Sequence, residues 1–534
     1  MKVTVERAQL LKSLGHVHRV VERRNTSPIL GNVLLRAEKA QLSLKATDLD
    51  LEVTETLAAE TATGGSTTVP AHMFYDIVRK LPDGSQIVLE GDGDRAVMAI
   101  RAGRSRFTLQ TLPESDFPDL AAGEMTHSFT LPAETANGGS TTVPAHMFYD
   151  IVRKLPDGSQ IILESDGERA ELLRSLSHVH RVVERRNTIP ILANVLIRAE
   201  RSKLSFKATD LDLEVTEAIA AEVVAGGSTT VPAHLFYDIV RKLPEGSQVV
   251  LEGSGDRAVV AIRAGRSRFT LQTLPETDFP DLAAGEMTHR FTLAAGDLKR
   301  LIDKTQFAIS TEETRYYLNG IYLHTPGAAK APALRAVATD GHRLAQVEFA
   351  MPEGAGGMPG IIVPRKTVGE IQRLIEDPGA DVVVELSQSK IRFTLGQVVL
   401  TSKLIDGTFP DYARVIPAGN DKELVVEKKE FEQAVDRVST VSSERGRAVK
   451  LSLSNGRLML SVTNPDSGSA TEEIEVDYGS DPLDIGFNSR YLLDIAAQID
   501  GEKAVLRLAD PGSPTLIEDK NSSGTLYVLM PMRV

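Results

Sequence analysis

The stretch that decides the fold is GGSTTVPAHMFYDIVRKLPDGSQIILE, residues 138–164, because nearly the same residues stand at 64–90 and again at 226–252. Each copy has a strand-like run, then a short helix with apolar residues on one face, then a turn and a second strand-like run. A long stretch repeated in this way predicts a repeated architecture, which has to be defined before any single motif is interpreted.

The repeat extends well beyond this stretch. Residues 9–131 recur at 171–293, and Phe-Pro-Asp closes a unit at 117–119, 279–281 and 409–411. We therefore divide the chain into 1–131, 132–170, 171–291, 292–416 and 417–534, where 132–170 holds only a strand, a helix and a strand. Alternating runs such as 41–56 and 95–112 indicate strands in hairpins. The predicted fold class is α+β, with antiparallel sheets that pack short helices on one face.

Composition limits the classes of function. The 534 residues are 42% hydrophobic and 25% charged, with no apolar run long enough for a membrane helix and no signal-peptide core at the start. We therefore expect an intracellular, cytoplasmic protein. Cysteine is absent, which excludes disulfides, zinc–thiolate sites and cysteine nucleophiles.

The predicted helices carry basic residues although the formal net charge is −13. In 9–24, Lys12, His16, Arg19 and Arg23 form a stripe beside an apolar stripe. Later helices look similar and add Lys304, Arg373 and Arg437, and the second copy repeats the first stripe at Arg174, His178, Arg181 and Arg185. One such face is usually only solvated, but its recurrence in an acidic chain predicts a positive surface for a phosphate backbone, without base reading.

Six motifs in order identify a family. They are RYYLNG (315–320), ATDGHRLA (338–345), VPRK (363–366), TSKLIDGTFPDY (401–412), IGFNSRYLLD (485–494) and MPMRV (530–534). Together they resemble the bacterial DNA polymerase III beta subunit, the sliding clamps, and residues 1–131 match the first clamp domain a second time. The resemblance implies three similar domains, each a pair of βαβββ halves, in a homodimeric ring with antiparallel sheets outside and helices lining a central hole.

The resemblance also implies a function and its sites. A sliding clamp is a non-catalytic processivity factor in DNA replication, which encircles duplex DNA and binds the replicative polymerase and clamp-loader subunits through short linear peptides. The implied DNA contacts are Arg24, Arg186, Arg241, Arg365 and Lys366. The implied partner-peptide cleft consists of Leu318, Thr339, Gly341, His342, Arg343, Leu344, Pro410, Val415, Met530, Pro531, Met532 and Arg533. The implied dimer contact sets Arg266, Arg268, Phe269 and Leu271 against Thr440 and Val441.

Three positions depart from the family pattern. Pro514 stands where the cleft usually has a small polar residue, Glu312 replaces an uncharged DNA contact, and Thr440 replaces a larger aliphatic residue at the dimer contact. We expect Glu312 to weaken DNA binding and Thr440 to reduce the apolar contact. For the cleft, the alternative is a buried final strand at 530–532 with His342 as an ordinary turn residue.

The duplication has structural consequences. The copy at 171–291 lacks its own first strand, and we expect 160–164 to fill that place. Two strands can now form the dimer contact, through Phe107 and Leu109 or through Phe269 and Leu271. The second choice keeps a six-domain ring, so we favour it.

Two other functions remain open. If the duplication blocks docking, the chain is a clamp-derived peptide-binding protein that cannot close a ring. Asp48, Asp50 and Glu52 share one strand face and could hold Mg²⁺ in an enzyme. A solvated outer face is the simpler interpretation of these carboxylates, and we expect no metal, no cofactor and no catalysis.

Overall fold

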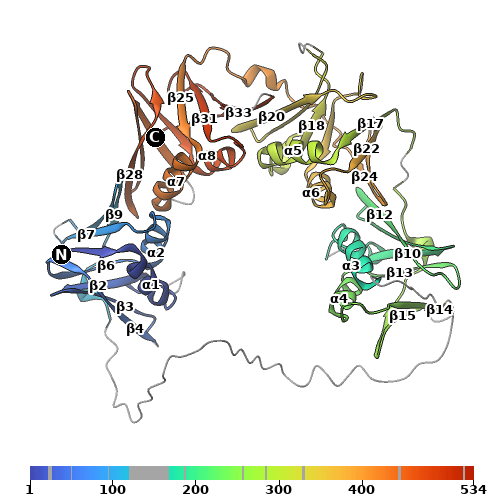
Figure 1. Ribbon diagram of the computed structural model, residues 1–534, viewed down its shortest axis with the longest axis horizontal. Coiled ribbons are helices and arrows are strands. Elements are labelled where there is room, and N and C mark those ends of the chain that lie inside the picture. The colour runs from blue at the N-terminus through green and yellow to red at the C-terminus, as the bar shows by residue number, and fades with distance from the viewer. Residues whose placement is uncertain are drawn as a thin grey trace, which may run out of the picture. The chain divides into compact units, whose positions relative to one another are not determined.

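The structure is a computed structural model that describes residues 1–21, 27–49, 51–93, 95–118, 168–185, 188–254, 258–282, 285–327, 331–442, 447–520 and 524–534. It divides into two compact units. The first unit consists of Met1–Ser128, Thr339–Val347 and Pro410–Val534, and the second of Phe129–Ala338 and Glu348–Phe409. Figure 1 labels the helices and strands of each unit.

The first unit begins with two βαβββ halves. The first half is β1 (Lys2–Glu6), α1 (Arg7–Val17), β2 (Asn32–Glu38), β3 (Gln41–Thr47) and β4 (Glu52–Ala58). After the short β5 (Glu60–Thr63), the second half is β6 (Gly65–Pro70), α2 (Ala71–Lys80), β7 (Gln86–Asp92), β8 (Val97–Ala102) and β9 (Ser105–Gln110). The carboxylate of Glu6 caps α1 by accepting the amides of Ala8 and Gln9.

The C-terminal part of the first unit repeats this pattern. One half is β25 (Lys422–Glu427), α7 (Lys428–Val438), η9 (Ser439–Val441), β26 (Ala448–Ser454), β27 (Arg457–Asn464) and β28 (Gly468–Glu475), followed by β29 (Asp477–Tyr478). The other half is β30 (Leu483–Asn488), α8 (Ser489–Ala496), β31 (Lys503–Leu508), β32 (Thr515–Asp519) and β33 (Thr525–Leu529). The beginning of β20 (Arg343–Ala350) pairs antiparallel with β33.

One nine-stranded sheet joins the two ends of the chain. Its order is β30-β26-β27-β28-β9-β8-β7-β1-β5, so an N-terminal strand and a C-terminal strand are hydrogen-bonded neighbours. Figure 1 shows β9 beside β28 and α2 beside α7. The remaining N-terminal strands form a sheet with the order β4-β3-β2-β6, in which β4 is an outer strand.

The second unit contains the second copy and the central part of the chain. The second copy has α3 (Glu168–Val179), β10 (Asn194–Glu200), β11 (Lys203–Thr209), β12 (Leu213–Ala220), β13 (Gly227–Pro232), α4 (Ala233–Lys242), β14 (Val250–Ser254), β15 (Val259–Ala264) and β16 (Ser267–Gln272). The central part has β17 (His289–Ala294), α5 (Ala295–Thr305), η7 (Glu313–Leu318), β18 (Gly320–His324), β19 (Ala333–Thr339), β21 (Ile361–Pro364), α6 (Arg365–Leu374), β22 (Asp381–Leu386), β23 (Lys390–Leu395) and β24 (Val398–Lys403).

The two parts of this unit share an eight-stranded sheet. Its order is β13-β10-β11-β12-β24-β23-β22-β17, in which β12 pairs antiparallel with β24. A separate sheet has the order β14-β15-β16. Antiparallel sheets with short helices recur in both units, which confirms the predicted α+β class.

Among the described residues, none of the second copy fills the space that β1 fills in the first copy. In the first copy, β1 pairs with β7, and a Cβ placed on Gly65 would lie 3.4 Å from the Cβ of Met1. At the matching Gly227, a Cβ would meet nothing within 4 Å, and a cavity of about 510 Å³ lies beside it. The expected substitute strand at 160–164 lies outside the described residues.

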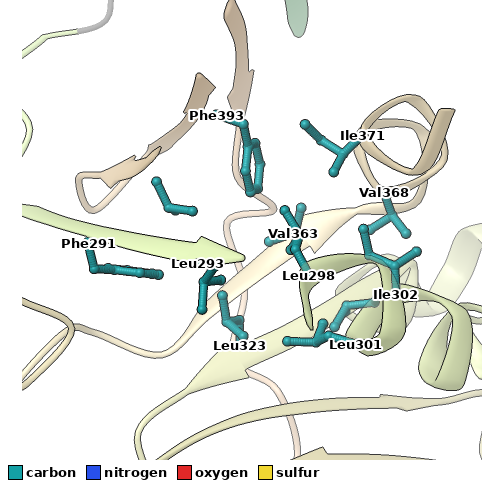
Figure 2. Close-up of a pocket in the computed structure, with 12 residues that line it drawn as sticks. Phe291, Leu293, Leu298, Leu301, Ile302, Leu323, Val363, Val368, Ile371 and Phe393 are labelled. Carbon is teal, nitrogen blue, oxygen red and sulfur yellow. The ribbon is translucent and has the colours of Figure 1, made fainter. Parts of the chain in front are cut away.

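The central part of the second unit has an apolar core. A cavity of about 30 Å³ lies there, lined only by aliphatic and phenylalanine side chains, with Phe291, Phe393 and Ile371 around it (Figure 2). An apolar void of this size has no polar partner for water. We interpret it as a packing gap in the core rather than as a ligand site.

Candidate nucleic-acid and partner-peptide sites

The turn before β20 is rigid and presents an exposed histidine. The carboxylate of Asp340 accepts the amides of His342 at 2.9 Å and Arg343 at 3.0 Å. Gly341 has φ +88°, which favours glycine, and its amide donates to the Thr339 hydroxyl at 3.1 Å. The His342 side chain is therefore held at the surface without a flexible backbone.

Arg343 connects this turn to α8. Its guanidinium donates to Asp340 at 3.1 Å and to Asp494 at 2.5 Å, and it lies 4.3 Å from the centroid of the Tyr491 ring. Burial, above all, raises the pKa of the Tyr491 hydroxyl. Arg343 is largely buried, so two carboxylates and an aromatic face fix its position. Tyr491 and Asp494 were not among the predicted site residues, although both stand in the quoted motif 485–494.

The C-terminal residues are fixed beside this turn. The Met530 amide donates to the His342 carbonyl at 2.9 Å, and the Met532 amide donates to the Gly486 carbonyl at 2.8 Å. β33 ends at Leu529, and the Met530 side chain is 38% exposed, so the alternative of a buried final strand at 530–532 is wrong. Methionine next to a fixed turn gives an adaptable apolar surface.

The other predicted cleft residues are distributed over both units. In the first unit, Leu344 is buried in β20, while Pro410 and Val415 are exposed at the surface. Pro531 and Met532 are half-buried and Arg533 is exposed. Leu318 is buried at the end of η7 in the second unit. Pro514 uses its carbonyl to accept the Asn420 side chain at 2.9 Å.

The predicted DNA contacts have different environments. Arg241 is exposed near the end of α4, where it pairs with Asp238 at 2.9 Å, and Arg365 is exposed at the start of α6. Lys366 is bound to Asp210 and lies 3.4 Å from Glu184. Burial disfavours its charge, but these carboxylates outweigh that effect and raise the pKa of Lys366. Arg24 and Arg186 lie outside the described residues.

Glu312, the departure at the DNA contact, is engaged within its own turn. Both of its carboxylate oxygens accept hydrogen bonds from the Arg315 guanidinium, at 2.8 and 2.6 Å. This pairing reduces the negative charge that Glu312 presents to solvent.

Three residues assigned to the basic helix faces are buried, so that part of the prediction is wrong. Lys304 is 7% exposed, and Arg437 is 7% exposed with its guanidinium on Glu472. His178 is also 7% exposed and contacts Glu217 at 2.9 Å and Glu376 at 3.1 Å. Burial disfavours the protonated ring, but the two carboxylates outweigh it and raise the pKa of His178. Helical spacing placed these residues on a face without showing which helices pack over it.

The predicted dimer contact stays a prediction, and within one chain the β28 edge that it involves is occupied. The outer edge of β28 is already paired with β9 of the same chain, from Gly468 opposite Leu109 to Glu472 opposite Ser105. Phe107 is buried there, whereas Phe269 lies on β16, at an outer position of the sheet β14-β15-β16. Within one chain, β9 of the N-terminal copy therefore occupies this edge, and the expectation that Phe269 and Leu271 of a second chain lie on it stays a prediction.

The remaining residues of the predicted dimer contact lie in η9 and at β16. Val441 is fully buried in η9, and Thr440 is half-buried with its hydroxyl on the Asp436 carbonyl at 3.3 Å. Arg266 directly precedes β16 and Arg268 lies within it, and both are exposed.

The candidate enzyme carboxylates are engaged in the backbone turn and in ion pairs. Asp48 accepts the Leu51 amide at 2.7 Å, and Glu52 pairs with Lys45 at 2.9 Å. Asp50 lies outside the described residues. Among the described residues, no group of three or more histidine, aspartate or glutamate side chains could hold a metal ion. The described helices are also too short or too polar to cross a membrane.

Comparisons with known proteins agree with these observations. The family profile described as DNA polymerase III beta subunit, N-terminal domain, matches residues 1–121, 122–175 and 167–283. The profiles for the central and C-terminal domains of that subunit match 292–411 and 413–533. The repeated N-terminal match fits a duplication.

Individual relatives cover the same part of the chain. A beta sliding clamp of Caulobacter vibrioides is 55% identical over 367 residues, which are 69% of this chain and 99% of the relative. The beta sliding clamp of Escherichia coli K12 is 40% identical over 370 residues, also 69% of this chain and 99% of the relative. A crystal structure of a sliding clamp from Bartonella birtlesii, bound to griselimycin, has a TM-score of 0.68 and 57% identity, and covers 70% of this chain and all of its own.

Proposed function

Because the chain belongs to the DNA polymerase III beta subunit family, the beta sliding clamps, we propose that it encircles duplex DNA and tethers the replicative polymerase. It is a non-catalytic DNA sliding clamp of the replication machinery, and it acts as a homodimeric ring in the cytoplasm. The observation that carries this proposal is the match over 99% of the Caulobacter clamp at 55% identity.

The partner-peptide site is the part of the proposal with the most support from geometry. Arg343 is fixed by Asp340, Asp494 and Tyr491, and Met530 offers an exposed apolar side chain beside His342. A short peptide with aliphatic or aromatic side chains would bury Met530 against a turn that needs no reordering. Pre-organisation of this kind reduces the entropy lost on binding.

The DNA contact is weak and independent of sequence. Arg241 and Arg365 offer exposed guanidinium groups to phosphates. The Lys366 ammonium is instead paired with the carboxylates of Asp210 and Glu184. A small number of phosphate contacts gives weak electrostatic binding to DNA, and weak binding permits sliding. A chain held by topology does not need tight ionic binding.

Retention on circular DNA tests the proposal. The chain, loaded by a bacterial clamp loader onto a nicked circle, should co-elute with the circle on gel filtration and dissociate after the circle is linearised. Retention on the circle should also survive added salt, because topology is not screened whereas phosphate contacts are. Equal retention on circular and linear DNA, or retention on neither, would contradict encirclement.

A further inference from the structure

Two strands of identical sequence have different environments in this chain. Ser105–Gln110 and Ser267–Gln272 both read SRFTLQ. β9 is paired on both sides, by β8 and β28, whereas β16 pairs only with β15 among the described residues. Phe107 is 1% exposed and Ser105 is 4% exposed, while their counterparts Phe269 and Ser267 are only half-buried. β9 therefore lies on the edge of β28, and β16, which has the same sequence, would fit the same edge.

The backbone of β28 is shaped for a close neighbour. Gly468 has φ +119° and lies opposite Leu109, where a Cβ would collide with the Thr108 carbonyl oxygen. Only glycine allows the two strands to approach this closely at that point. The edge of β28 is thus shaped to pair with a neighbouring strand, and its contact with β9 is not incidental.

A buried ion pair is completed by the N-terminal copy. Glu472 is 4% exposed and accepts the Arg437 guanidinium at 3.0 Å. The Ser105 hydroxyl donates to the same carboxylate at 2.8 Å. A buried carboxylate needs all its hydrogen-bond partners, so the serine of an incoming strand contributes directly to the interface.

Charges at the rim add to this contact. Lys80 at the end of α2 donates to the Asp436 carboxylate at 2.8 Å and to its carbonyl at 3.0 Å. Arg104 pairs with Glu475 at 2.6 Å. The matching residues of the second copy, Lys242 and Arg266, are exposed. The second copy therefore carries the same set of groups without a β28 edge to use them on.

We propose that the N-terminal copy is a built-in competitor for ring closure, which occupies the β28 edge of its own chain until the β16 strand of a second copy replaces it. The proposal rests on the sliding-clamp function for the meaning of ring closure. It explains why a chain with a duplicated first domain leaves no unpaired edge on β28, which would otherwise invite aggregation. The homodimer then forms by exchange of one SRFTLQ strand for another.

The contacts made by the two strands are equivalent, so the tether decides between them. With an effective concentration of about 1 mM, the value for a short flexible linker, β9 competes about 1000-fold more strongly than a second copy at about 1 µM protein. The chain should therefore be largely monomeric when dilute, with dimers appearing as its concentration rises.

Engineered disulfides test which strand lies on the β28 edge, and the protein has no cysteine of its own that would interfere. Thr108 lies directly opposite Ser469, and Thr270 is its counterpart on β16. Opposite residues in antiparallel strands have Cα atoms about 4.5–5.5 Å apart, within the range for a disulfide. The full-length variant Thr108→Cys/Ser469→Cys reports pairing within one chain, and Thr270→Cys/Ser469→Cys reports pairing between two chains.

The expected result is a clear asymmetry on non-reducing gels. The Thr108 pair should link within the monomer at every concentration, and the Thr270 pair should give a linked dimer only as the concentration approaches the millimolar range. Efficient dimer linkage through Thr270 at about 1 µM would overturn the proposal, as would linkage of the Thr108 pair between chains, because either result removes the roughly 1000-fold advantage. Single-cysteine variants control for non-specific oxidation between chains, since none of them can form a link within one chain.

The disulfide test and the DNA-retention test distinguish failure of the competitor proposal from failure of the sliding-clamp proposal. Retention on circular DNA without the internal Thr108 link would reject the competitor and keep the clamp. At the near-millimolar concentrations where dimers form, the internal link without retention would reject encirclement and keep the competitor.

Discussion

The replacement Ser105→Ala gives a quantitative test of how the β28 edge is held. The Ser105 hydroxyl donates to Glu472 at 2.8 Å, and both residues are 4% exposed. A hydrogen bond to a buried charge contributes about 1.5–3 kcal/mol. Since Arg437 still pairs with Glu472 after the replacement, the carboxylate is not left without a partner, and the lower end of that range applies. About 1.4 kcal/mol is a tenfold change, so the pairing of β9 with β28 should weaken about tenfold.

The matched replacement Ser267→Ala makes the test specific. It removes the same hydroxyl from β16, so it leaves the pairing within the chain intact and weakens only the dimer that β16 would form. A homodimeric ring has two equivalent β16–β28 contacts, so each replacement acts twice. By sedimentation velocity on the full chain, the dimer dissociation constant should fall about 100-fold for Ser105→Ala and rise about 100-fold for Ser267→Ala. Shifts in the same direction for both variants, or no shift in either, would refute the exchange of equivalent strands on one edge.

Four further predictions concern other parts of the chain. Gly468→Ala should abolish both engineered disulfide links, because a Cβ there meets the Thr108 carbonyl, whereas Gly479→Ala, with nothing within 4 Å, should preserve them. Because the pKa of His178 is raised on folding, its stabilising contribution is complete below the unfolded value of about 6.5 and is lost as the pH rises through the folded value. Thermal unfolding should therefore show a loss of stability with rising pH that His178→Gln removes. Met530→Ser should weaken binding of a fluorescent polymerase peptide in an anisotropy assay about 10-fold, given about 1.5 kcal/mol for a partly exposed apolar side chain, and unchanged affinity would contradict the site. Amide hydrogens of β14 should exchange faster than those of β7, which has β1 as a neighbour, and equal protection would mean that a strand fills the open place.

Much of the fold could be predicted from the sequence, because it depends on local pattern. The apolar stripe Leu10, Leu14, Val17 gave α1, and all three side chains are buried. The alternating residues of 41–56 gave β3 and β4, which pair in a hairpin. The turn at Gly341 and the fixed Arg343 stand within one quoted motif, so the centre of the candidate peptide site was also visible.

Other features depend on packing between distant segments, which local spacing does not report. Arg437 has the spacing of a solvated basic stripe, but its guanidinium is buried on Glu472, 35 residues away in the sequence. His178 likewise faces Glu376, 198 residues away. A charge that pairs with a distant carboxylate cannot be told from an exposed one by helical periodicity alone.

Sequence cannot predict at all which of the two identical strands, β9 or β16, lies on β28. Ser105–Gln110 and Ser267–Gln272 have the same residues in the same order, so nothing in either strand predicts which one lies on β28. The outer edges show how the two copies differ. The second copy already uses β12 on β24, where Leu213 lies opposite Ser402, whereas the first copy has no central domain of its own and leaves β4 as an outer strand. The first copy retains β9 for docking, and in the structure β9 lies on the β28 edge of its own chain. On this argument, an insertion that looks like a disruption of the ring becomes a regulator of its assembly, and its strength depends on the tether rather than on any new contact.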